Sequence, residues 1–456
     1  MKKPLSFYLS ILAAKGTIRF MRMLGHNATD FPGKVALRLC PEVLKYFDMP
    51  KTVIGVTGTN GKTTTSNLIN HILSSNGYKF INNAAGGNIN SGIASVLLDN
   101  CTLKGGFKKD LALFEIDERS APRILPYITL DYLVCTNLQR DSMKRNAHTE
   151  FIFNILNEYI SPKTKLILNG DDLISSQLAI NNERVHFGLN QLEGERPTED
   201  NIICDIRSCP KCGHKLAYSF RHYNHIGRAK CVNCDFGSPA IDFETKSVQD
   251  GYALIDHNGT EERYKLPNHR ITDIYNTTAA IALTRTFGLS AEQVSSAMEK
   301  LEIVKTRYDS FTAAGKEVTV SLAKGQNPVA CSAMCDFIRH EPGNKAVIMI
   351  LDDANDAKNS SENIAWIYET DFEFLRGDDV KQIVIAGVRS HDYLVRSLIA
   401  GIDREKLACC MNEADAVGML KLENVDKILI MYDIFNGAAL KTICDQLKAL
   451  PEGEKK

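Results

Sequence analysis

The sequence predicts an α/β protein built on a doubly wound parallel sheet, with a second, smaller α/β domain towards the C-terminus. Three observations support this fold class. A short β-branched run, Thr52 to Val56, leads through a glycine-rich turn into a stretch with apolar residues at helical spacing. Apolar strands then alternate with helical segments, which is typical of parallel sheets. Two Cys-x2-Cys pairs interrupt this alternation and predict an inserted metal-binding ribbon.

The bulk composition is that of a soluble globular protein. Its 456 residues are enough for two or three domains, and 44% hydrophobic and 24% charged residues are ordinary values. The net charge of -1 gives no electrostatic reason to expect nucleic-acid binding. Lys15 and Arg19 interrupt the apolar N-terminus, which also has no clear small-residue cleavage site. We therefore expect no transmembrane segment and a cytoplasmic location.

Changes in composition along the chain predict three parts. Residues 1–50 contain one or two helices and form an N-terminal helical arm. Residues 51–304 form a middle domain, into which the ribbon is inserted at 204–242. Residues 305–456 form the C-terminal α/β domain. Its expected strands are 317–322, 345–351, 382–387 and 427–431.

The glycine-rich turn is the main candidate for binding chemistry. A turn of this kind points backbone N–H groups at a phosphate chain, adds a helix N-terminus and supplies a lysine ammonium. The residue after the lysine would place its hydroxyl on a magnesium ion. Val56 stands where the usual pattern has a glycine, so the motif is a shortened variant. The expected binding residues are Gly58, Thr59, Asn60, Gly61, Lys62, Thr63 and Thr64.

The next predicted strand begins at Leu111 and ends in three carboxylates. A carboxylate at the carboxyl end of a parallel strand beside a phosphate loop is suited to be a second magnesium ligand. A solvated strand end accounts well for Asp117 and Glu118. It accounts less well for Glu115, which lies within the apolar run. We therefore expect Glu115 and Thr63 to be magnesium ligands.

Polar loops also follow the next two predicted strands. In a doubly wound sheet, ligands bind at the carboxyl ends of the strands, where these loops lie. The earlier loop 81–88 is polar and glycine-rich, which fits either close approach to a terminal phosphate or a plain turn. The two strands and their loops are 130–136 followed by 137–141, and 164–168 followed by 169–172.

The ribbon carries the strongest local signal in the chain. Cys209, Cys212, Cys231 and Cys234 form two Cys-x2-Cys pairs separated by eighteen residues. Four thiolates at this spacing predict a tetrahedral zinc site, closed and therefore structural. The ribbon has no marked basic excess, so we expect no nucleic-acid contact. We do not count His214 as a ligand.

After the ribbon, an alanine-rich helix around 275–280 is expected to close the middle domain. The linker that follows contains Arg307, which has two interpretations: a contact with a phosphate, or an ordinary surface arginine.

Together these features resemble the Mur ligase superfamily, the ATP-dependent amide-forming enzymes of peptidoglycan synthesis. The four-cysteine ribbon within the middle domain narrows the resemblance to the MurT family, the ligase-like subunits of lipid II isoglutaminyl synthase. The similarity covers nearly the whole chain. The matching segments are 31–35, 58–65, 114–118, 136–138, 140–141, the four cysteines, Lys324 and 327–328.

The resemblance implies a Mur ligase-type sheet and an enzyme that uses ATP and Mg²⁺ to phosphorylate the α-carboxyl of D-glutamate in the lipid II stem peptide. Ammonia from a GatD-type glutamine amidotransferase subunit would then convert the acyl phosphate to D-isoglutamine. The implied assembly is a heterodimer at the inner face of the membrane. Lys62 takes the phosphate role, and Asn169 and Asn276 match positions associated with nucleotide contacts.

Members of this family carry an aspartate in the C-terminal domain that completes the Cys-His pair of the glutaminase. In the acidic loop 352–366, Asp356 matches that position best, and Asp353 is next. Asn363 replaces a second family aspartate. We therefore expect Asp356 to orient a histidine of the partner. The alternative is that these carboxylates only solvate the loop.

Two other functions remain open. The chain could be a Mur-type amino-acid ligase in the manner of folylpolyglutamate synthetase, although the ribbon and the short C-terminal domain count against this. It could also be a divergent ATP-binding partner subunit without turnover. Amidation with free ammonia would separate an active ligase from such a subunit.

Overall fold

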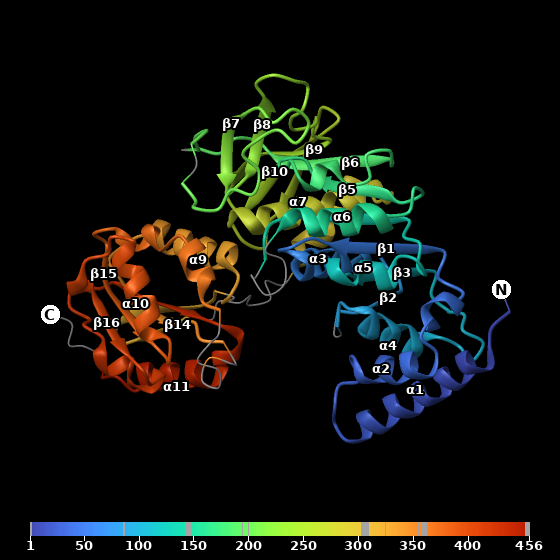
Figure 1. Cartoon of the computed structure of the whole chain (residues 1–456), viewed down its shortest axis with the longest axis horizontal. Coiled ribbons are helices and arrows are strands. Elements are labelled where there is room, and N and C mark those ends of the chain that lie inside the picture. Colours follow the sequence, from blue (N-terminus) through green and yellow to red (C-terminus); the bar gives the residue numbers. More distant parts are fainter. Residues whose placement is uncertain are drawn as a thin grey trace. The chain divides into compact units, whose positions relative to one another are not determined.

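A computed structural model describes residues 2–84, 87–141, 148–193, 195–198, 200–301, 310–323, 325–353, 356 and 363–451. The chain divides into two compact units (Figure 1). The N-terminal unit comprises residues 1–139, 148–198 and 205–302, and the C-terminal unit comprises residues 140–147, 199–204 and 303–456. Two short segments from the first half of the chain therefore belong to the C-terminal unit.

The described part of the N-terminal unit contains a nine-stranded sheet in the order β11-β10-β9-β6-β5-β4-β1-β3-β2. The strands from β2 to β9 run parallel, while β10 and β11 return antiparallel at one edge. Strand β1 lies between β3 and β4, inside the parallel part. The strands are β1 (Thr52–Thr57), β2 (Phe80–Asn82), β3 (Leu111–Glu115), β4 (Tyr132–Cys135), β5 (Lys165–Asn169), β6 (Arg184–Leu189), β9 (Phe243–Gln249), β10 (Tyr252–His257) and β11 (Thr260–Lys265).

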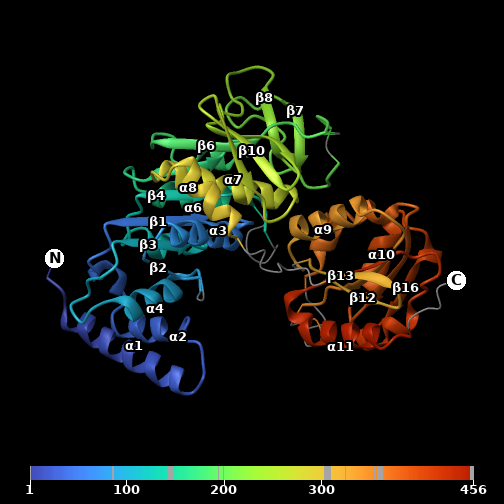
Figure 2. The same cartoon turned by 180° about the vertical axis from the view of Figure 1, so that it is seen from behind.

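Helices cover both faces of this sheet (Figure 2). Successive side chains of a strand point to opposite faces, and β1 shows this directly: Val53 packs with one core cluster, and Ile54 and Val56 with the other. The helices that contribute to the cluster of Val53 include α4 (Asn90–Asn100), α5 (Ala121–Ile124) and α6 (Thr149–Tyr159). Those of the opposite face are α3 (Lys62–Ser75), α7 (Ile271–Thr286) and α8 (Ala291–Glu299). The predicted doubly wound parallel sheet is confirmed.

The N-terminal arm forms a further helical layer outside α4 (Figure 1). It consists of α1 (Leu5–Met23) and α2 (Phe31–Leu39), followed by the 3-10 helix η1 (Val43–Tyr46). Phe7, Ile11 and Ala14 of α1 are fully buried in the core that α4 shares with the sheet. Within the described ranges, none of the helices has both the length and the apolarity needed to cross a bilayer.

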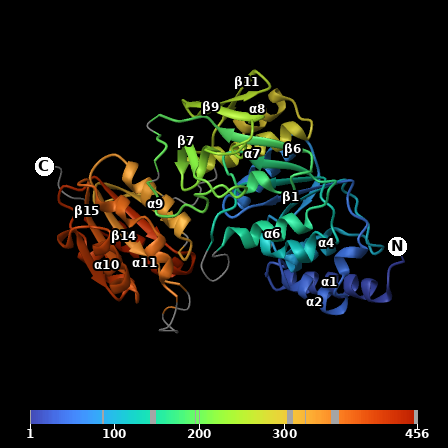
Figure 3. The same cartoon turned by 45° about the horizontal axis from the view of Figure 1, so that its top comes forward.

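The ribbon is an antiparallel hairpin of β7 (Leu216–Tyr223) and β8 (Ile226–Cys231). It follows β6 and precedes β9, and these two strands are direct neighbours in the large sheet (Figure 3). The insertion therefore leaves the strand order of the sheet intact. Leu216, Ala229 and Phe236 form a small core around the cysteines.

The C-terminal unit contains a second sheet whose described strands follow the order β12-β13-β17-β14-β15-β16. All pairs are parallel except β12 with β13. The strands are β12 (Ser310–Ala313), β13 (Lys316–Leu322), β14 (Lys345–Ile350), β15 (Val380–Ala386), β16 (Leu407–Cys410) and β17 (Lys427–Tyr432). The helices are α9 (Pro328–His340), α10 (Ser390–Ile399) and α11 (Gly437–Lys448). The expectation of a second α/β domain is confirmed.

Candidate active site

The glycine-rich turn joins β1 to α3, and two of its glycines are required by the geometry. Gly58 and Gly61 have φ angles of +125° and +87°, which side-chain-bearing residues rarely adopt. A Cβ on Gly58 would lie 2.2 Å from Thr136 Oγ1, and one on Gly61 would lie 2.1 Å from Asn276 Oδ1. The backbone of the turn is therefore packed closely on its inner side, where only glycine fits.

The N-terminus of α3 directly follows this turn. The N–H of Thr65 donates to the carbonyl oxygen of Gly61 at 2.9 Å and closes the first helical turn. The N–H groups of Lys62, Thr63 and Thr64 precede that bond and have no acceptor within the helix, which makes the helix end suitable for an anion. The Thr63 side chain is exposed beside them. The backbone therefore fits phosphate binding, and the exposed Thr63 hydroxyl is available to a magnesium ion.

Lys62 folds back over the turn. Its Nζ donates to the carbonyl oxygens of Gly58 and Thr59 and lies 3.3 Å from Glu118 Oε1. Burial by itself would lower the pKa of the Lys62 ammonium, but the nearby carboxylates, above all Glu118, outweigh burial and raise that pKa. Lys62 is therefore a fixed, positively charged group at the glycine-rich turn, which is called the phosphate turn below.

Glu118 is the site residue that the sequence interpretation missed. It begins the 3-10 helix η2 (Glu118–Ser120), and its side chain is only 3% exposed. Burial raises the pKa of the Glu118 carboxyl, and the neighbouring Lys62 offsets this only in part. The cluster of three carboxylates at the end of β3 was the available signal, but the strand pattern could not show which one turns towards the lysine.

Glu115 lies at the carboxyl end of β3, in register with Val56 of β1. Its Oε1 accepts a hydrogen bond from Asn88 Nδ2 at 3.0 Å. Asn83 bonds both the N–H and the carbonyl oxygen of Glu115, at 2.8 and 2.9 Å. Within the described part of loop 81–88, these two asparagines therefore position Glu115 one strand from the phosphate turn.

The loop after β4 braces the phosphate turn from the other side. Thr59 Oγ1 exchanges hydrogen bonds with the backbone of Gln139, at 2.9 and 3.0 Å. The Asn60 N–H donates to Asn137 Oδ1 at 3.1 Å, and the Asn60 carbonyl oxygen accepts from Thr136 Oγ1 at 2.6 Å. The polar loop predicted at 137–141 thus supports the turn through residues 137 and 139.

The remaining residues with predicted nucleotide contacts lie in different surroundings. Asn276 of α7 packs against Gly61 and accepts from Thr65 Oγ1 at 3.3 Å, so it adjoins the turn. Asn169 is fully buried at the end of β5, which β4 separates from β1. Its Nδ2 donates to the carbonyl oxygen of Thr136 at 3.1 Å. Arg307 lies outside the described residues.

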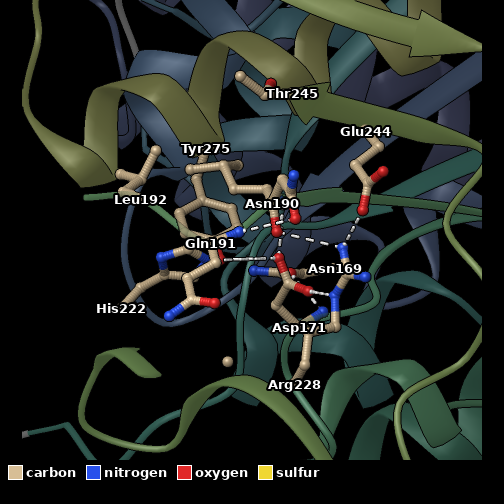
Figure 4. Close-up of polar contacts among 12 residues, drawn as sticks. Asn169, Asp171, Asn190, Gln191, Leu192, His222, Arg228, Glu244, Thr245 and Tyr275 are labelled. Atoms are coloured by element: carbon tan, nitrogen blue, oxygen red, sulfur yellow. Dashed lines mark hydrogen bonds and ion pairs between the residues drawn. The ribbon is translucent and has the colours of Figure 1, made fainter. Parts of the chain in front are cut away.

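A buried polar cluster joins the ribbon hairpin to the end of β5 (Figure 4). Asp171 accepts hydrogen bonds from Arg228 of β8, from Tyr275 of α7 at 2.8 Å and from the N–H of Leu189 at 2.7 Å. Arg228 also pairs with Glu244 at 2.7 Å. Strand β5, the ribbon and α7 are therefore held together at the edge of the sheet that carries the phosphate turn.

The adjacent Asp172 is also fully buried and contacts the ribbon. His225, at the turn between β7 and β8, lies 3.2 Å from Asp172 Oδ1 through its Nε2. The other oxygen, Oδ2, accepts the N–H of Leu138 at 2.7 Å. Burial would lower the pKa of His225, but Asp172 and then Asp205 outweigh it, so that the pKa is raised.

The four ribbon cysteines converge as predicted for a metal site. Their sulfur atoms all lie within 4.8 Å of one another, and the Cys209–Cys234 and Cys212–Cys231 pairs are 3.5 and 3.4 Å apart. Tetrahedral zinc–thiolate bonds place sulfurs about 3.8 Å apart, so the donor set fits this ion. His214 instead directs its Nδ1 to the carbonyl oxygen of Cys212.

In the C-terminal unit, acidic residues gather where β14 and β17 end. Asp356 is 9% exposed, and its Oδ2 accepts the N–H of Asp353 at 2.6 Å. Its Oδ1 lies 3.5 Å from Arg389 Nε. Burial raises the pKa of Asp352 to about 6. Residues 354, 355 and 357–362 of this loop lie outside the described residues.

Comparisons with known proteins agree with this architecture. Residues 56–204 match the family described as Mur ligase middle domain, and residues 324–434 match MurT ligase C-terminal. Among solved structures, a pseudomurein peptide ligase type C from Methanothermus fervidus superposes with a TM-score of 0.68 at 20% identity, covering 90% of this chain and 81% of that one. MurF ligase from Thermotoga maritima in complex with ADP superposes with a TM-score of 0.57 at 15% identity, covering 91% of this chain and 83% of that one.

Two relatives are similar over most of the chain. The lipid II isoglutaminyl synthase (glutamine-hydrolyzing) subunit MurT of Staphylococcus aureus is 33% identical over 407 residues, which is 88% of this chain and 89% of the relative. The subunit of the same name from Streptococcus pneumoniae is 30% identical over 404 residues, 88% of each chain. With these identities over this length, and with the Mur ligase fold and ribbon described above, the chain belongs to the MurT family.

Proposed function

We propose that this chain is the ligase subunit of a glutamine-hydrolysing synthase that amidates the D-glutamate α-carboxyl of the lipid II stem peptide. The observation that carries the proposal is Lys62, held over a glycine turn at a helix N-terminus with Glu118 and Glu115 beside it. This arrangement suits phosphoryl transfer, which depends mainly on positioning and charge stabilisation. The names of the relatives supply the substrate class and the nitrogen donor.

In the first step, a carboxylate oxygen of the substrate attacks the γ-phosphorus of ATP, and ADP leaves. The N–H groups at the start of α3 and the Lys62 ammonium would bind the phosphates. Thr63 and Glu115 would hold Mg²⁺, which neutralises phosphate charge. Glu118 would keep Lys62 charged and directed to the turn when phosphate is absent.

In the second step, ammonia attacks the carbonyl carbon of the acyl phosphate, inorganic phosphate leaves, and the nitrogen loses a proton to give the amide. A GatD-type glutaminase partner would supply the ammonia. Asp356, or Asp353 beside it, would orient a histidine of that partner. The partners of this heterodimer would work on the lipid-linked substrate at the inner face of the membrane.

The ribbon is proposed to hold one structural Zn²⁺ through Cys209, Cys212, Cys231 and Cys234. The short sulfur–sulfur distances support this, as does the backbone N–H of Asn233, which donates to Cys231 Sγ at 3.4 Å. The small apolar core around these cysteines contains few residues, so the metal would contribute much of the local folding energy.

The proposed reaction is tested with the purified chain, ATP, Mg²⁺, ammonium chloride and either lipid II or a water-soluble stem peptide. Mass spectrometry of the product should detect one new amide at D-glutamate, formed with ADP and phosphate. ATP hydrolysis without amide would contradict the proposal. So would a product to which an amino acid has been added, which is the outcome expected of a folylpolyglutamate synthetase-like ligase.

A further inference from the structure

Helix α1 has two apolar faces, which lie on opposite sides of the helix. Phe7, Ile11, Ala14 and Ile18 face the core and are at most 3% exposed. The opposite side carries a second set of large apolar residues, which are between 50% and 84% exposed. This set, called the α1 ridge below, consists of Leu5, Leu9, Leu12, Phe20 and Met23.

The ridge is continuous along the helix. Its members, together with Gly16, follow steps of four, three, four, four and three residues, so they form one row on the helix surface. The 19 residues of α1 give this row a length of about 27 Å. Figures 1 and 2 show α1 at the margin of the N-terminal unit, with α2 and α4 on one side of it. The outer side of a surface helix is normally polar, so such a ridge indicates an interaction surface.

The charged residues of α1 and of its flanking segments are of one sign. Residues 2–29 contain five Lys or Arg and neither Asp nor Glu. The whole arm 1–50 has a net charge of +5, against -1 for the complete chain. Lys15, Arg19 and Arg22 follow one another at steps of four and three and border the ridge. Arg22 pairs with Asp99 at 2.7 Å, yet its side chain remains 61% exposed.

We infer that α1 is a membrane-docking helix, which lays the α1 ridge into the headgroup region of an anionic lipid bilayer. An apolar row bordered by basic side chains is the pattern of helices that lie in the plane of the interface. The three cations within the helix are unsuited to a spanning segment. A protein partner would have to present a long apolar groove with a uniformly acidic border. An anionic bilayer offers an apolar interior and negatively charged headgroups over its whole surface.

The docking surface is inferred from α1 alone. Its use in reaching a lipid-linked substrate rests on the proposed function. In that setting the helix would hold the enzyme where the lipid-anchored stem peptide is concentrated, which would lower the apparent KM for the lipid-linked substrate. The KM for a water-soluble stem peptide would not change.

The test measures flotation of the full-length chain with vesicles of phosphatidylglycerol and phosphatidylcholine, and with phosphatidylcholine alone. We expect binding to the anionic vesicles that weakens with salt. The double variant Leu12→Ser/Phe20→Ser should bind at least about tenfold more weakly, because it removes two large apolar contacts. Leu103→Ser/Ile180→Ser is the matched control: its residues are 60% and 61% exposed, compared with 57% and 63% for Leu12 and Phe20.

Three results would overturn the inference. The wild type could fail to float with anionic vesicles at low salt. The ridge variant could float as well as the control variant. The ridge variant could instead lose self-association or glutaminase binding in light scattering while no form binds vesicles, which would identify a protein as the occupant. Amidation of the water-soluble peptide is scored separately, so its absence would contradict the proposed function and leave the vesicle result unaffected.

Discussion

His225 Nε2 lies 3.2 Å from Asp172 Oδ1, and both side chains are fully buried. Through its other oxygen, Asp172 holds the N–H of Leu138 at 2.7 Å, next to Gln139, whose backbone exchanges hydrogen bonds with Thr59 of the phosphate turn. A continuous set of contacts therefore runs from the tip of the ribbon hairpin to the phosphate turn. The ribbon therefore supports the loop 137–141, although its cysteines lie elsewhere in the insertion.

Replacing His225 by alanine is expected to weaken both the fold and ATP binding. The change leaves the Asp172 carboxylate buried without its charged partner, which typically costs about 3 kcal/mol. Thermal unfolding should occur at a lower temperature, and the KM for ATP should rise more than kcat falls. His225→Gln, which can still donate a hydrogen bond, should recover the KM. An unchanged KM in a destabilised alanine variant would show that the contact is structural only.

The same pair predicts how stability depends on pH. The pKa of His225 is raised above its ordinary value of 6.5, with Asp172, Asp205 and Arg221 as its charged neighbours. Its stabilising contribution is therefore complete below about pH 6.5 and is lost as pH rises through the folded-state pKa. The pKa of Asp172 is lowered, so its contribution is lost only in acid, as pH falls below 3.8. Between pH 6 and 9 the melting temperature of the wild type should fall more steeply than that of His225→Gln. Parallel curves would contradict this assignment.

Loss of one ribbon cysteine is expected to destabilise the protein much more than it changes nucleotide contacts. Cys212→Ser would remove one of the four proposed zinc ligands, and the small core around it cannot compensate. Metal analysis of wild type purified without chelators should find one zinc per chain, and the variant should unfold at a lower temperature. Cys444→Ser, outside the ribbon, is the control. Wild type without zinc would contradict the prediction.

Lys62→Ala is expected to reduce turnover about a hundredfold or more, because it removes a preorganised charge from the transferred phosphate. Glu115→Ala should act similarly through loss of a magnesium ligand, and added Mg²⁺ should partly restore its rate. ADP release is the measurement. Lys51→Ala, at a lysine that is 79% exposed, should leave the rate unchanged. A wild-type rate in Lys62→Ala would make the assignment of the phosphate turn wrong.

Asp356→Asn is expected to reduce glutamine-dependent amidation while leaving amidation from ammonium salts largely intact, because the carboxylate would act on a histidine of the partner. Asp353→Asn is the matched variant, since Asp353 is less buried and bonded to Asp356 through its N–H. Equal loss with both nitrogen sources would place Asp356 in the ligase site or in the fold. If Asp353→Asn alone showed the selective loss, the orienting role would belong to Asp353.

Local sequence was sufficient for the features that depend on neighbouring residues. The phosphate turn needs Gly58, Gly61 and Lys62 at short spacing, and the ribbon needs two Cys-x2-Cys pairs, so both are readable from the chain. In the large sheet, β1, β3, β4 and β5 were predicted because buried strands form apolar runs of limited length, whereas β2 and β6 were not predicted. The parallel strand β9 and the antiparallel edge strands β10 and β11 were not predicted either, since their mixed polar pattern has no such run.

Only the tertiary structure decided which distant side chains meet. The sequence distinguished Glu115, which lies within the apolar run of β3, but gave Asp117 and Glu118 the same interpretation. The turn at η2 directs Glu118 to Lys62, while Asn83 and Asn88 hold Glu115. The contact of His225 with Asp172 joins residues 53 positions apart. The exposure of the α1 ridge likewise depends on which face α2 and α4 cover. The reason is physical: periodicity along a segment determines which residues share a face, whereas burial and partners depend on the elements packed against it.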